Sequence, residues 1–537
     1  MGLIYRRTAL AAEVADNNGA DLPLPENPAP PSLAAALDKM LADRAGAVAV
    51  LSEARNSSGL PPALSIQRRD PDLEARFRES AELVLRGLPN ELRHTPSDLR
   101  DVHPDSNAAS GSRERRLWEF FQARAAAMLR TNRLADGSVV PLEEEDYLRM
   151  EILVPDTESL LARARRGVEI LRGAHGRSRV AGAMPLGGAS TRANTWVSQN
   201  AEVCAARGIT PGMPRFQYPL QGRFLAQITL ENRLAMGQMV GATIPSIIMT
   251  NSEIAETLFA ALSQVARSWA AADRQNTVLF NQIVLPRLWV EDGAEVGEQL
   301  YPAGHGNFPL LLAQLKIIAA LKAAGVEYLM FSNGDEFMWG PDPVLLDIAR
   351  ELKDAGHGML AVVVPNSVGQ MGGGAVKDAA GRHMLVETPR LPWNIMCSGQ
   401  APLALNAAFY ILSVEYLAAA MDALLHAETF LDVKTMPRDD RVQQVIGADS
   451  WAGDVFSALL SPRFLWWERR NYLGIKTPAD VIGQVPMQHL GGRSNADYLA
   501  ECDRKYPNVM EALINGNPAV ARQLVENGYQ YVEVDLG

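Results

Sequence analysis

The most informative stretch of the chain, residues 327–343, has the sequence Glu-Tyr-Leu-Met-Phe-Ser-Asn-Gly-Asp-Glu-Phe-Met-Trp-Gly-Pro-Asp-Pro. Its apolar part, Tyr328–Phe331, has the length and composition of a buried strand. A turn follows at Asn333-Gly334, and a helix is expected from Pro343 to just before Gly356. This order of strand, acidic turn and helix is typical of α/β proteins, which bind ligands at the carboxyl edge of the sheet.

Two carboxylates, Asp335 and Glu336, lie in the turn that follows the expected strand. A carboxylate at such an edge can hold a divalent cation against phosphate oxygens. The alternative is that Asp335 only caps the turn. Position alone leaves both interpretations open.

Further short apolar runs after Arg179 alternate with helical patterns. With the central run, the expected strands are Val180–Leu186, Ser246–Thr250, Val278–Pro286, Tyr328–Ser332 and Met359–Pro365. Helices are expected between them, for example at Asn251–Ala271 and Asn307–Ala324. The alternation predicts an α/β fold whose mixed, mainly parallel sheet is flanked by helices.

Three parts are expected, because 537 residues are too many for one hydrophobic core. Residues 1–172 form a helical N-terminal region with a disordered start, with helices expected at Ser32–Ala45, Asp70–Leu88 and Arg113–Arg130. Residues 173–426 hold the α/β core. Residues 427–537 form a smaller α+β part, in which helical segments and Trp-rich loops lead to a strand-like run at Tyr529–Val534.

Composition restricts the class of protein. With 47% hydrophobic and 21% charged residues, the chain resembles an ordinary soluble protein. Its formal charge of −11 argues against nonspecific nucleic-acid binding but not against a nucleotide ligand. No signal peptide or membrane-spanning run is visible. The three cysteines are far apart in sequence, as in proteins of a reducing compartment. We therefore expect a cytoplasmic protein with neither a membrane nor a nucleic acid as partner.

The first candidate binding loop follows the first expected strand and contains Gly187-Gly188. Paired glycines let backbone N–H groups approach an anionic or planar ligand. A purely structural turn is the alternative. The loop is neither a dinucleotide-binding fingerprint nor a P-loop, so an NAD-dependent oxidoreductase is disfavoured.

A second candidate is Gly304-His305-Gly306, directly before an expected helix. A histidine held there can reach a phosphate, with the helix N-terminus behind it. The alternative is a turn with an exposed imidazole.

The order of these loops resembles the UDP-glucose pyrophosphorylase family and its UDP-N-acetylhexosamine relatives. The resemblance covers roughly residues 180–485. The matching motifs after the Gly-Gly loop are Met249–Ser252, Phe280–Gln282, Gly304–Gly306, Asn333–Asp335, Gly372–Gly374, Leu385–Glu387, Leu405-Asn406, Asp432–Lys434, Val442–Gln444, Arg463-Phe464 and Ile475–Asp480. So many motifs in one order are not expected by accident.

The resemblance implies a GT-A-like (Rossmann-like) nucleotidyltransferase core that joins a nucleoside triphosphate to a sugar 1-phosphate and releases pyrophosphate. The nucleophile is already an anion, so positioning and charge neutralisation replace a general base. The implied cofactor is Mg²⁺, which would offset the repulsion between the phosphates. UTP and glucose 1-phosphate are the family's default substrates.

Matched residue by residue, the resemblance also implies the site. The expected nucleotide contacts, with Gln282 at the base edge, are Leu186, Gly187, Gly188, Gln282 and Gly304. The expected sugar-phosphate contacts are His305, Gly373, Glu387 and Asn406. The expected cations for the phosphates are Lys434, Lys476 and Arg215. The expected metal ligand is Asp335.

The chain departs from the family where the substrates would bind. The family's Pro-Lys pair has its nearest match in Pro214-Arg215, and a guanidinium does not reproduce the geometry of an ammonium. The Gly-Gly loop continues with Ala189-Ser190 in place of a third glycine. The family's Gln-Leu-Glu-Thr stretch has become Gln443–Ile446. A changed donor or acceptor follows more naturally from these departures than the family's default substrates.

Three hypotheses follow. The first is an active enzyme on UTP and glucose 1-phosphate. The second is the same chemistry on another nucleotide, such as GTP, and a cyclitol 1-phosphate in a specialised pathway. The third is a non-catalytic relative that binds a nucleotide sugar. The sequence does not indicate the base, the sugar or the oligomeric state.

Overall fold

The computed structural model describes most of the chain. The described residues are 29–41, 49–50, 63–65, 70–89, 92, 116, 120, 139–186, 196–220, 222–251, 258, 276–298, 300–334, 340–366, 372–387, 390–391, 404–426, 429–438, 441–468, 475, 478–483, 492 and 494–529. The chain divides into a short unit, Met1–Pro30, and a large unit, Pro31–Gly537. The fold described below is that of the large unit.

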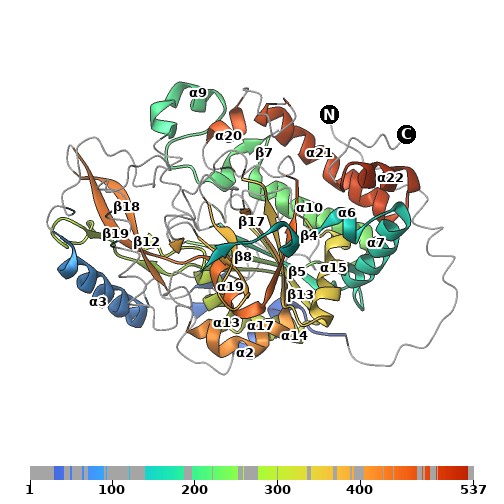
Figure 1. Cartoon of the computed structure of the whole chain (residues 1–537), viewed down its shortest axis with the longest axis horizontal. Coiled ribbons are helices and arrows are strands. Elements are labelled where there is room, and N and C mark those ends of the chain that lie inside the picture. Colours follow the sequence, from blue (N-terminus) through green and yellow to red (C-terminus); the bar gives the residue numbers. More distant parts are fainter. Residues whose placement is uncertain are drawn as a thin grey trace. The chain divides into compact units, whose positions relative to one another are not determined.

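A large mixed sheet forms the centre of this unit (Figure 1). The strands of its main path, in spatial order, are β1 (Ala49–Val50), β2 (Ala63–Ser65), β9 (Thr277–Asn281), β8 (Ser246–Thr250), β5 (Val180–Pro185), β13 (Tyr328–Ser332), β17 (Leu405–Ser413), β14 (Met359–Val364), β20 (Pro462–Trp466) and β4 (Leu148–Arg149). Strands β2 to β13 are parallel to one another, as are β14, β20 and β4. Strand β17 is antiparallel to both of its neighbours. The expected mixed, mainly parallel sheet is confirmed.

The chain changes direction across the sheet at β5. Strands β8 and β9 lie on one side of β5, and the chain then crosses to β13 on the other side. The connections at the carboxyl ends of β5 and β13 therefore diverge. In open α/β sheets this topological switch point is where ligands bind.

Smaller sheets and a branch complete the strand structure. The branch from β17 consists of β15 (Gly374–Lys377), β16 (His383–Val386) and β3 (Val140–Pro141). The smaller sheets are β10 (Val284–Leu285) with β12 (Tyr301–Pro302), β6 (Pro219–Leu220) with β7 (Arg223–Phe224), and β11 (Leu288–Trp289) with the hairpin β18 (Phe430–Arg438) and β19 (Arg441–Asp449).

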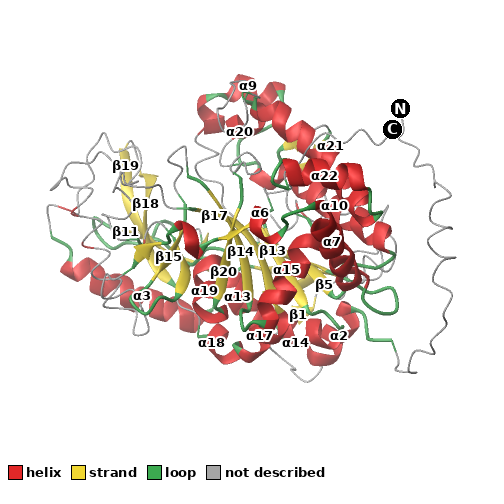
Figure 2. Ribbon diagram, turned by 45° about the vertical axis from the view of Figure 1, so that its right-hand side comes forward, coloured by secondary structure: helices red, strands yellow, loops and turns green. Residues whose placement is uncertain are grey.

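Helices cover both faces of the large sheet (Figure 2). Side chains alternate along β13, so Met330 joins the apolar cluster on one face and Phe331 the cluster on the other. The Met330 face is covered by α7 (Thr157–Arg172), α10 (Leu225–Val240), α15 (Pro343–Asp354), α21 (Asn495–Ile514) and α22 (Pro518–Glu526). The Phe331 face is covered by α2 (Leu33–Leu41), α13 (Asn307–Gln314), α14 (Ile317–Ala323), α17 (Val414–Ala419), α18 (Met421–Leu425) and α19 (Ala452–Leu460). The remaining helical elements are α3 (Pro71–Gly87), α6 (Met150–Leu153), α9 (Ala201–Ala206), α20 (Pro478–Ile482) and the 3₁₀ turns Glu144–Asp146 and Arg215–Gln217.

Several expected elements agree with the structure and others need correction. Strands β8 and β13 have the expected bounds, and α3 begins at Pro71 after its cap Asp70. The expected helix Asn307–Ala324 is two helices, α13 and α14, because Lys316 between them has a left-handed φ of 59°. The expected helices Asn251–Ala271 and Arg113–Arg130 lie largely outside the described residues.

The C-terminal part differs most from expectation. Residues expected to form helical segments and loops after residue 427 instead begin with the hairpin β18–β19, whose strands pair over nine positions each. The alternation of Asp432 and Lys434 with apolar neighbours is typical of a strand with one polar face. Of the expected strand at Tyr529–Val534, only Tyr529 is described. The division into three parts remains a prediction.

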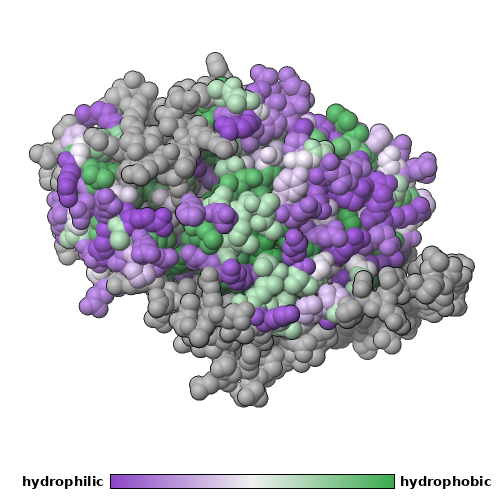
Figure 3. All heavy atoms as spheres, turned by 90° about the horizontal axis from the view of Figure 1, so that it is seen from below, coloured by the Kyte–Doolittle hydropathy of each residue, from purple (hydrophilic) through white to green (hydrophobic). Residues whose placement is uncertain are grey.

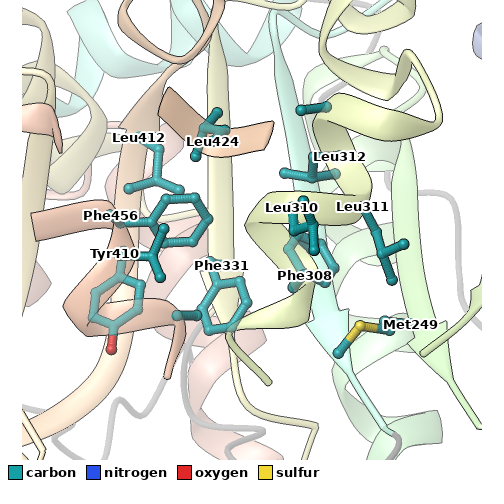
Figure 4. Close-up of a cluster of buried hydrophobic side chains, with 14 of the residues drawn as sticks. Met249, Phe308, Leu310, Leu311, Leu312, Phe331, Tyr410, Leu412, Leu424 and Phe456 are labelled. Carbon is teal, nitrogen blue, oxygen red and sulfur yellow. The ribbon is translucent and has the colours of Figure 1, made fainter. Parts of the chain in front are cut away.

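An aromatic row joins the elements beneath the carboxyl edge of the sheet (Figure 4). Phe308 of α13 lies 5.2 Å, between ring centroids, from Phe331 of β13. Phe331 stacks on Tyr410 of β17 at 5.3 Å and meets Phe456 of α19 edge-on at 5.9 Å. Such pairs add about 0.5–1.5 kcal/mol each beyond burial. The row fixes α13 and α19 against the strands that carry the candidate loops.

Surface hydrophobic side chains are spread over separate elements. The exposed large ones are Leu83, Val140, Ile152, Val203 and Leu425. On the face in Figure 3, hydrophobic residues in green lie among hydrophilic residues in purple. Among the described helices, none combines the length and hydrophobicity that crossing a bilayer requires.

Candidate functional site

The carboxyl ends of β5 and β13 meet through a glycine. A Cβ atom on Gly334 would lie 1.8 Å from Cδ2 of Leu186, so only glycine permits this contact. The Leu186 N–H donates to the Met249 carbonyl at 2.6 Å. The Leu186 side chain is buried, which leaves its backbone as the part that could meet a ligand. The other expected residues of this edge, Gly187, Gly188 and Asp335, lie outside the described residues.

Two carboxamides converge on one backbone carbonyl beside this edge. The Gln282 side chain, just after β9, donates through Nε2 to the Gly304 carbonyl. The Asn307 side chain donates to the same carbonyl at 2.9 Å and to the Ala303 carbonyl at 2.8 Å. A carbonyl only accepts hydrogen bonds, so the amide nitrogens must face it and the amide oxygens must point elsewhere.

Both amide oxygens are buried and lack a partner. Neither Oε1 of Gln282 nor Oδ1 of Asn307 has a hydrogen-bond donor among the described residues, and the same holds for the Thr250 hydroxyl at the end of β8. A buried polar group without a partner costs about 1–3 kcal/mol. This part of the structure therefore presents acceptors that a bound ligand or water can satisfy.

The loop Gly304-His305-Gly306 fits closely against the start of α19. A Cβ on Gly304, whose φ is +82°, would lie 2.0 Å from Oδ1 of Asp449. A Cβ on Gly306 would lie 2.4 Å from the Trp451 nitrogen. Both glycines are thus explained by close backbone approach.

His305 is oriented by the first turn of α19. Its Nδ1 accepts a hydrogen bond from the Ala452 N–H at 3.1 Å. An accepting Nδ1 carries no proton, so the proton of the neutral imidazole is on Nε2. His305 can therefore present an N–H donor to an anionic oxygen.

Lys434 lies in a group of charged side chains behind this loop. Its Nζ is 2.7 Å from Asp449 and 3.2 Å from Asp432. Burial lowers the pKa of Lys434, but the two carboxylates outweigh burial and hold that pKa above its ordinary value. Arg287, whose guanidinium lies 4.0 Å from the Tyr301 ring centre, balances the remaining charge. The expected contact of Lys434 with a phosphate remains a prediction.

Three expected sugar-phosphate residues lie together at β17. The Asn406 N–H donates to the Gly373 carbonyl at 2.8 Å. A Cβ on Gly373 would lie 2.6 Å from Oε1 of Glu387, so the Glu387 carboxylate covers the glycine. The Asn406 side chain donates to the Tyr410 hydroxyl at 2.8 Å and accepts from the Ala408 N–H at 2.9 Å. These polar groups satisfy one another.

Helix α19 holds this group through hydrogen bonds to Asp454. The Glu387 N–H donates to Oδ1 of Asp454 at 3.0 Å, and Arg390 donates to its other oxygen. Burial raises the pKa of Asp454 to about 6, and the Arg390 charge opposes that shift.

Of the two further expected cations, Arg215 belongs to the described residues. Arg215 donates through Nη1 to the Ile475 carbonyl at 2.7 Å, directly before position 476. Lys476 itself lies outside the described residues. Arg215 thus links the segment before α10 to the C-terminal motif.

Two polar residues of this region were not anticipated. Asn307 begins the helix expected after Gly304-His305-Gly306, but its carbonyl partners depend on the fold. Arg233 occupies a mainly apolar stripe of α10 that includes Ala226, Leu230 and Gly237. A charge in such a stripe was the only available signal. Among the described residues, no three His, Cys, Asp or Glu side chains gather as metal ligands, so Mg²⁺ at Asp335 remains an expectation.

The sequence comparison decides the family. The model described as UTP–glucose-1-phosphate uridylyltransferase matches residues 221–484. Over these residues, just under half of its length, the chain is a divergent match to this family. Members of this family are sugar-1-phosphate nucleotidyltransferases. The match therefore confirms the expected class of enzyme. A comparison with curated protein sequences finds no match.

The chain is similar to several solved structures. The UDP-N-acetylglucosamine pyrophosphorylase of Trypanosoma brucei has a TM-score of 0.53 and 15% identity, over 88% of this chain and 99% of its own. A putative UDP-N-acetylglucosamine pyrophosphorylase from Entamoeba histolytica has a TM-score of 0.48 and 16% identity, over 63% and 82%. The UDP-glucose phosphorylase of Trypanosoma brucei has a TM-score of 0.47 and 18% identity, over 64% and 68%. The first of these likenesses supports the α/β architecture.

Proposed function

We propose that the chain joins a nucleoside triphosphate to a sugar-like 1-phosphate and releases pyrophosphate. The observation that carries this proposal is the meeting of distant motifs at one edge of the sheet. Leu186 contacts Gly334, and Gln282 bonds Gly304. Farther along the same edge, Asn406 bonds Gly373. In α/β sheets this edge is the ligand-binding edge.

The reaction needs little covalent help from the protein. An oxygen of the acceptor phosphate forms a bond to the α-phosphorus of the triphosphate, while the bond from that phosphorus to the β-phosphate oxygen breaks and pyrophosphate leaves. His305 would donate its Nε2–H to a phosphate oxygen, and Arg215 and Lys476 would offset negative charge. Mg²⁺ held by Asp335 would supply further neutralisation of the phosphates.

The acceptor would bind at β17. The Glu387 carboxylate accepts hydrogen bonds from hydroxyl groups, and the backbone at Gly373 allows a ring to approach closely. Since Asn406 is already held by Tyr410, it would present a fixed geometry to the acceptor.

A GT-A core and a cytoplasmic location remain expectations.

The base would be recognised through acceptors. Oε1 of Gln282, which has no donor among the described residues, suits a ring N–H, which both uracil and guanine possess. UTP with glucose 1-phosphate, the family's default pair, is the first candidate.

A second candidate is GTP, with an acceptor such as a cyclitol 1-phosphate. The observation in its favour is a second acceptor that lacks a donor in the described structure, Oδ1 of Asn307. The amide nitrogens of Asn307 and Gln282 donate to the same Gly304 carbonyl. Guanine offers two adjacent donors, its N1–H and its amino group, whereas uracil offers one. Two acceptors therefore match the two donors of guanine better than the single donor of uracil.

Calorimetric titration with the four common nucleoside triphosphates, each with Mg²⁺, tests the proposal. We expect tight binding of one triphosphate, followed by pyrophosphate release when the correct sugar-like 1-phosphate is added. An Asn307→Ala variant, which loses the second acceptor, should weaken GTP about tenfold and leave UTP unchanged. If no triphosphate binds but a UDP- or GDP-linked sugar does, the catalytic proposal is wrong and the chain is a binding relative.

A further inference from the structure

Arg233, in the middle of α10, is a buried cation that the proposed chemistry has not used. Its side chain is 2% exposed, and its one hydrogen bond is a long contact of 3.5 Å from Nη2 to the Ala183 carbonyl. Its Nε and Nη1 atoms have no partner within the described part of the chain. Burial lowers the pKa of Arg233 to about 10, which leaves the group charged at neutral pH.

The guanidinium lies directly on the central strand β5. A Cβ on Gly182 would lie 2.3 Å from its Cζ, so the glycine makes room for the arginine. The residues paired with Gly182 on the same face are Ser246 and Met330, neither of which carries a charge. The buried carboxylate Asp347, in contrast, is paired with three arginines. Arg233 therefore differs from Asp347, because no ion pair to it is found among the described residues.

Arg233 lies below the candidate phosphate region. Leu186 at the end of β5 shares an apolar cluster with Ala226 and Leu230, so the first turns of α10 lie at the carboxyl edge. Helical side chains lean toward the helix N-terminus, which directs Arg233 toward that edge. At about 3.3 Å per strand residue, the guanidinium over Gly182 is roughly 10–13 Å from Leu186.

We propose that the charge of Arg233, for which the described residues offer no ion-pair partner, attracts the phosphates of the nucleotide bound at the carboxyl ends of β5 and β13. The inference rests on the proposed function and deepens it, because it assigns part of the triphosphate affinity to a residue that touches no substrate. Arg233 is thus a positioning residue. A buried charge is poorly screened by salt, and at this distance its attraction is on the order of tenfold in affinity. The charge of Arg233 would add positive electrostatic potential in a chain that lacks the lysine of the family's Pro-Lys pair.

The test compares Arg233→Met with Arg233→Lys, two side chains of similar length that differ in charge. Calorimetry measures the affinity for the bound triphosphate and for its nucleoside, and urea denaturation measures stability. We expect Arg233→Met to bind the triphosphate about tenfold more weakly, to bind the nucleoside unchanged and to resist urea better, because an unpaired buried charge is gone. Arg233→Lys should keep the triphosphate preference.

Arg166→Met is the matched control. It removes a positive charge that is already paired with Asp347, and it should change neither affinity. If the methionine variant does not fold, Arg233→Gln replaces it in the same comparison with Arg233→Lys.

Three results would overturn the inference. Equal losses for triphosphate and nucleoside would show that Arg233 only packs. Wild-type triphosphate affinity in the methionine variant would show that its charge does not reach the phosphates. Failure of the wild type to bind any triphosphate would contradict the proposed function itself, and the inference with it.

Discussion

The two ends of the candidate site are built differently. On the β17 side, comprising Gly373, Glu387, Asn406, Tyr410 and Asp454, polar groups bond one another. On the β5 side, comprising Thr250, Gln282, Asn307 and Arg233, buried polar atoms lack partners within the described structure.

Among the described residues, the polar groups of the β17 side are therefore paired without a ligand, whereas the β5 side has buried atoms with which a ligand could pair. A preformed site loses little conformational freedom on binding. Unpartnered groups lower stability until a ligand pairs with them, so a ligand of the β5 side should also stabilise the fold.

The largest effect is expected at Asp335, which follows β13 in the sequence. Asp335→Asn should reduce Mg²⁺-dependent turnover by about 10³-fold or more, because the amide loses the charge that holds the cation. Stability should change by less than about 0.5 kcal/mol, since a turn residue of this kind is not part of the core. Steady-state kinetics and urea denaturation measure both, with Glu336→Gln as the matched control. Unchanged turnover would remove Asp335 from the metal site.

Asp342 provides a contrast with the β5 side that pH can test, because it is a buried polar group that does have donors. It caps α15 through the N–H groups of Val344 and Leu345 and accepts from the Tyr529 hydroxyl at 2.5 Å. Burial raises its pKa from 3.8 to about 6. The folded state therefore binds the proton more tightly than the unfolded state does. The stability gained is fully present below about pH 4 and is lost as the pH rises through about 6.

The measurement is urea denaturation of the wild type and Asp342→Asn between pH 4 and pH 7. The stability of the wild type relative to the variant should fall by on the order of 3 kcal/mol over that range. The other carboxylates are present in both proteins, so their contribution cancels in the difference in unfolding free energy between the wild type and the variant. A constant difference would show that Asp342 titrates normally.

Lys434 probes the region between the two sides. Lys434→Met leaves Asp432 and Asp449 without their shared cation, so we expect a loss of about 2 kcal/mol in unfolding free energy. The loss is smaller than for a fully buried pair because the Lys434 side chain is 36% exposed. Adding Asp432→Asn and Asp449→Asn should restore much of it. Unchanged stability with a raised KM for the phosphates would instead support a direct contact with substrate.

The smallest effect is expected from filling the β17 side. In Gly373→Ala the new methyl group would push against the Glu387 carboxylate. We expect a KM for the sugar-like phosphate raised about tenfold, with nucleotide affinity unchanged. If both affinities fall together, the two sides are not independent and the contrast between them is wrong.

The sequence predicted the fold best where short apolar runs end in turn residues, as at β8 and β13. It did not predict β17, because Leu405–Ser413 mixes alanine and leucine, which suit a helix, with aromatic residues and one isoleucine, which suit a strand. The place of β17 between β13 and β14 is set by partners that lie far away in sequence.

The site shows the same limit. Motif order pointed to Gln282, Gly304, Gly373 and Asn406, and the structure brings them together in pairs. It did not point to Asn307 or Arg233, because their significance lies in which atoms they meet and which they do not. The missing partner of a buried group is visible only in three dimensions.

The pairing of β4 with β20 has a consequence for how the protein is made. Leu148 of β4 cannot pair until Leu465 of β20, about 300 residues later in the chain, has been synthesised. At the usual 5–20 residues per second, a ribosome needs roughly 15–60 s to cover that distance. This edge of the sheet is therefore synthesised early and completed late.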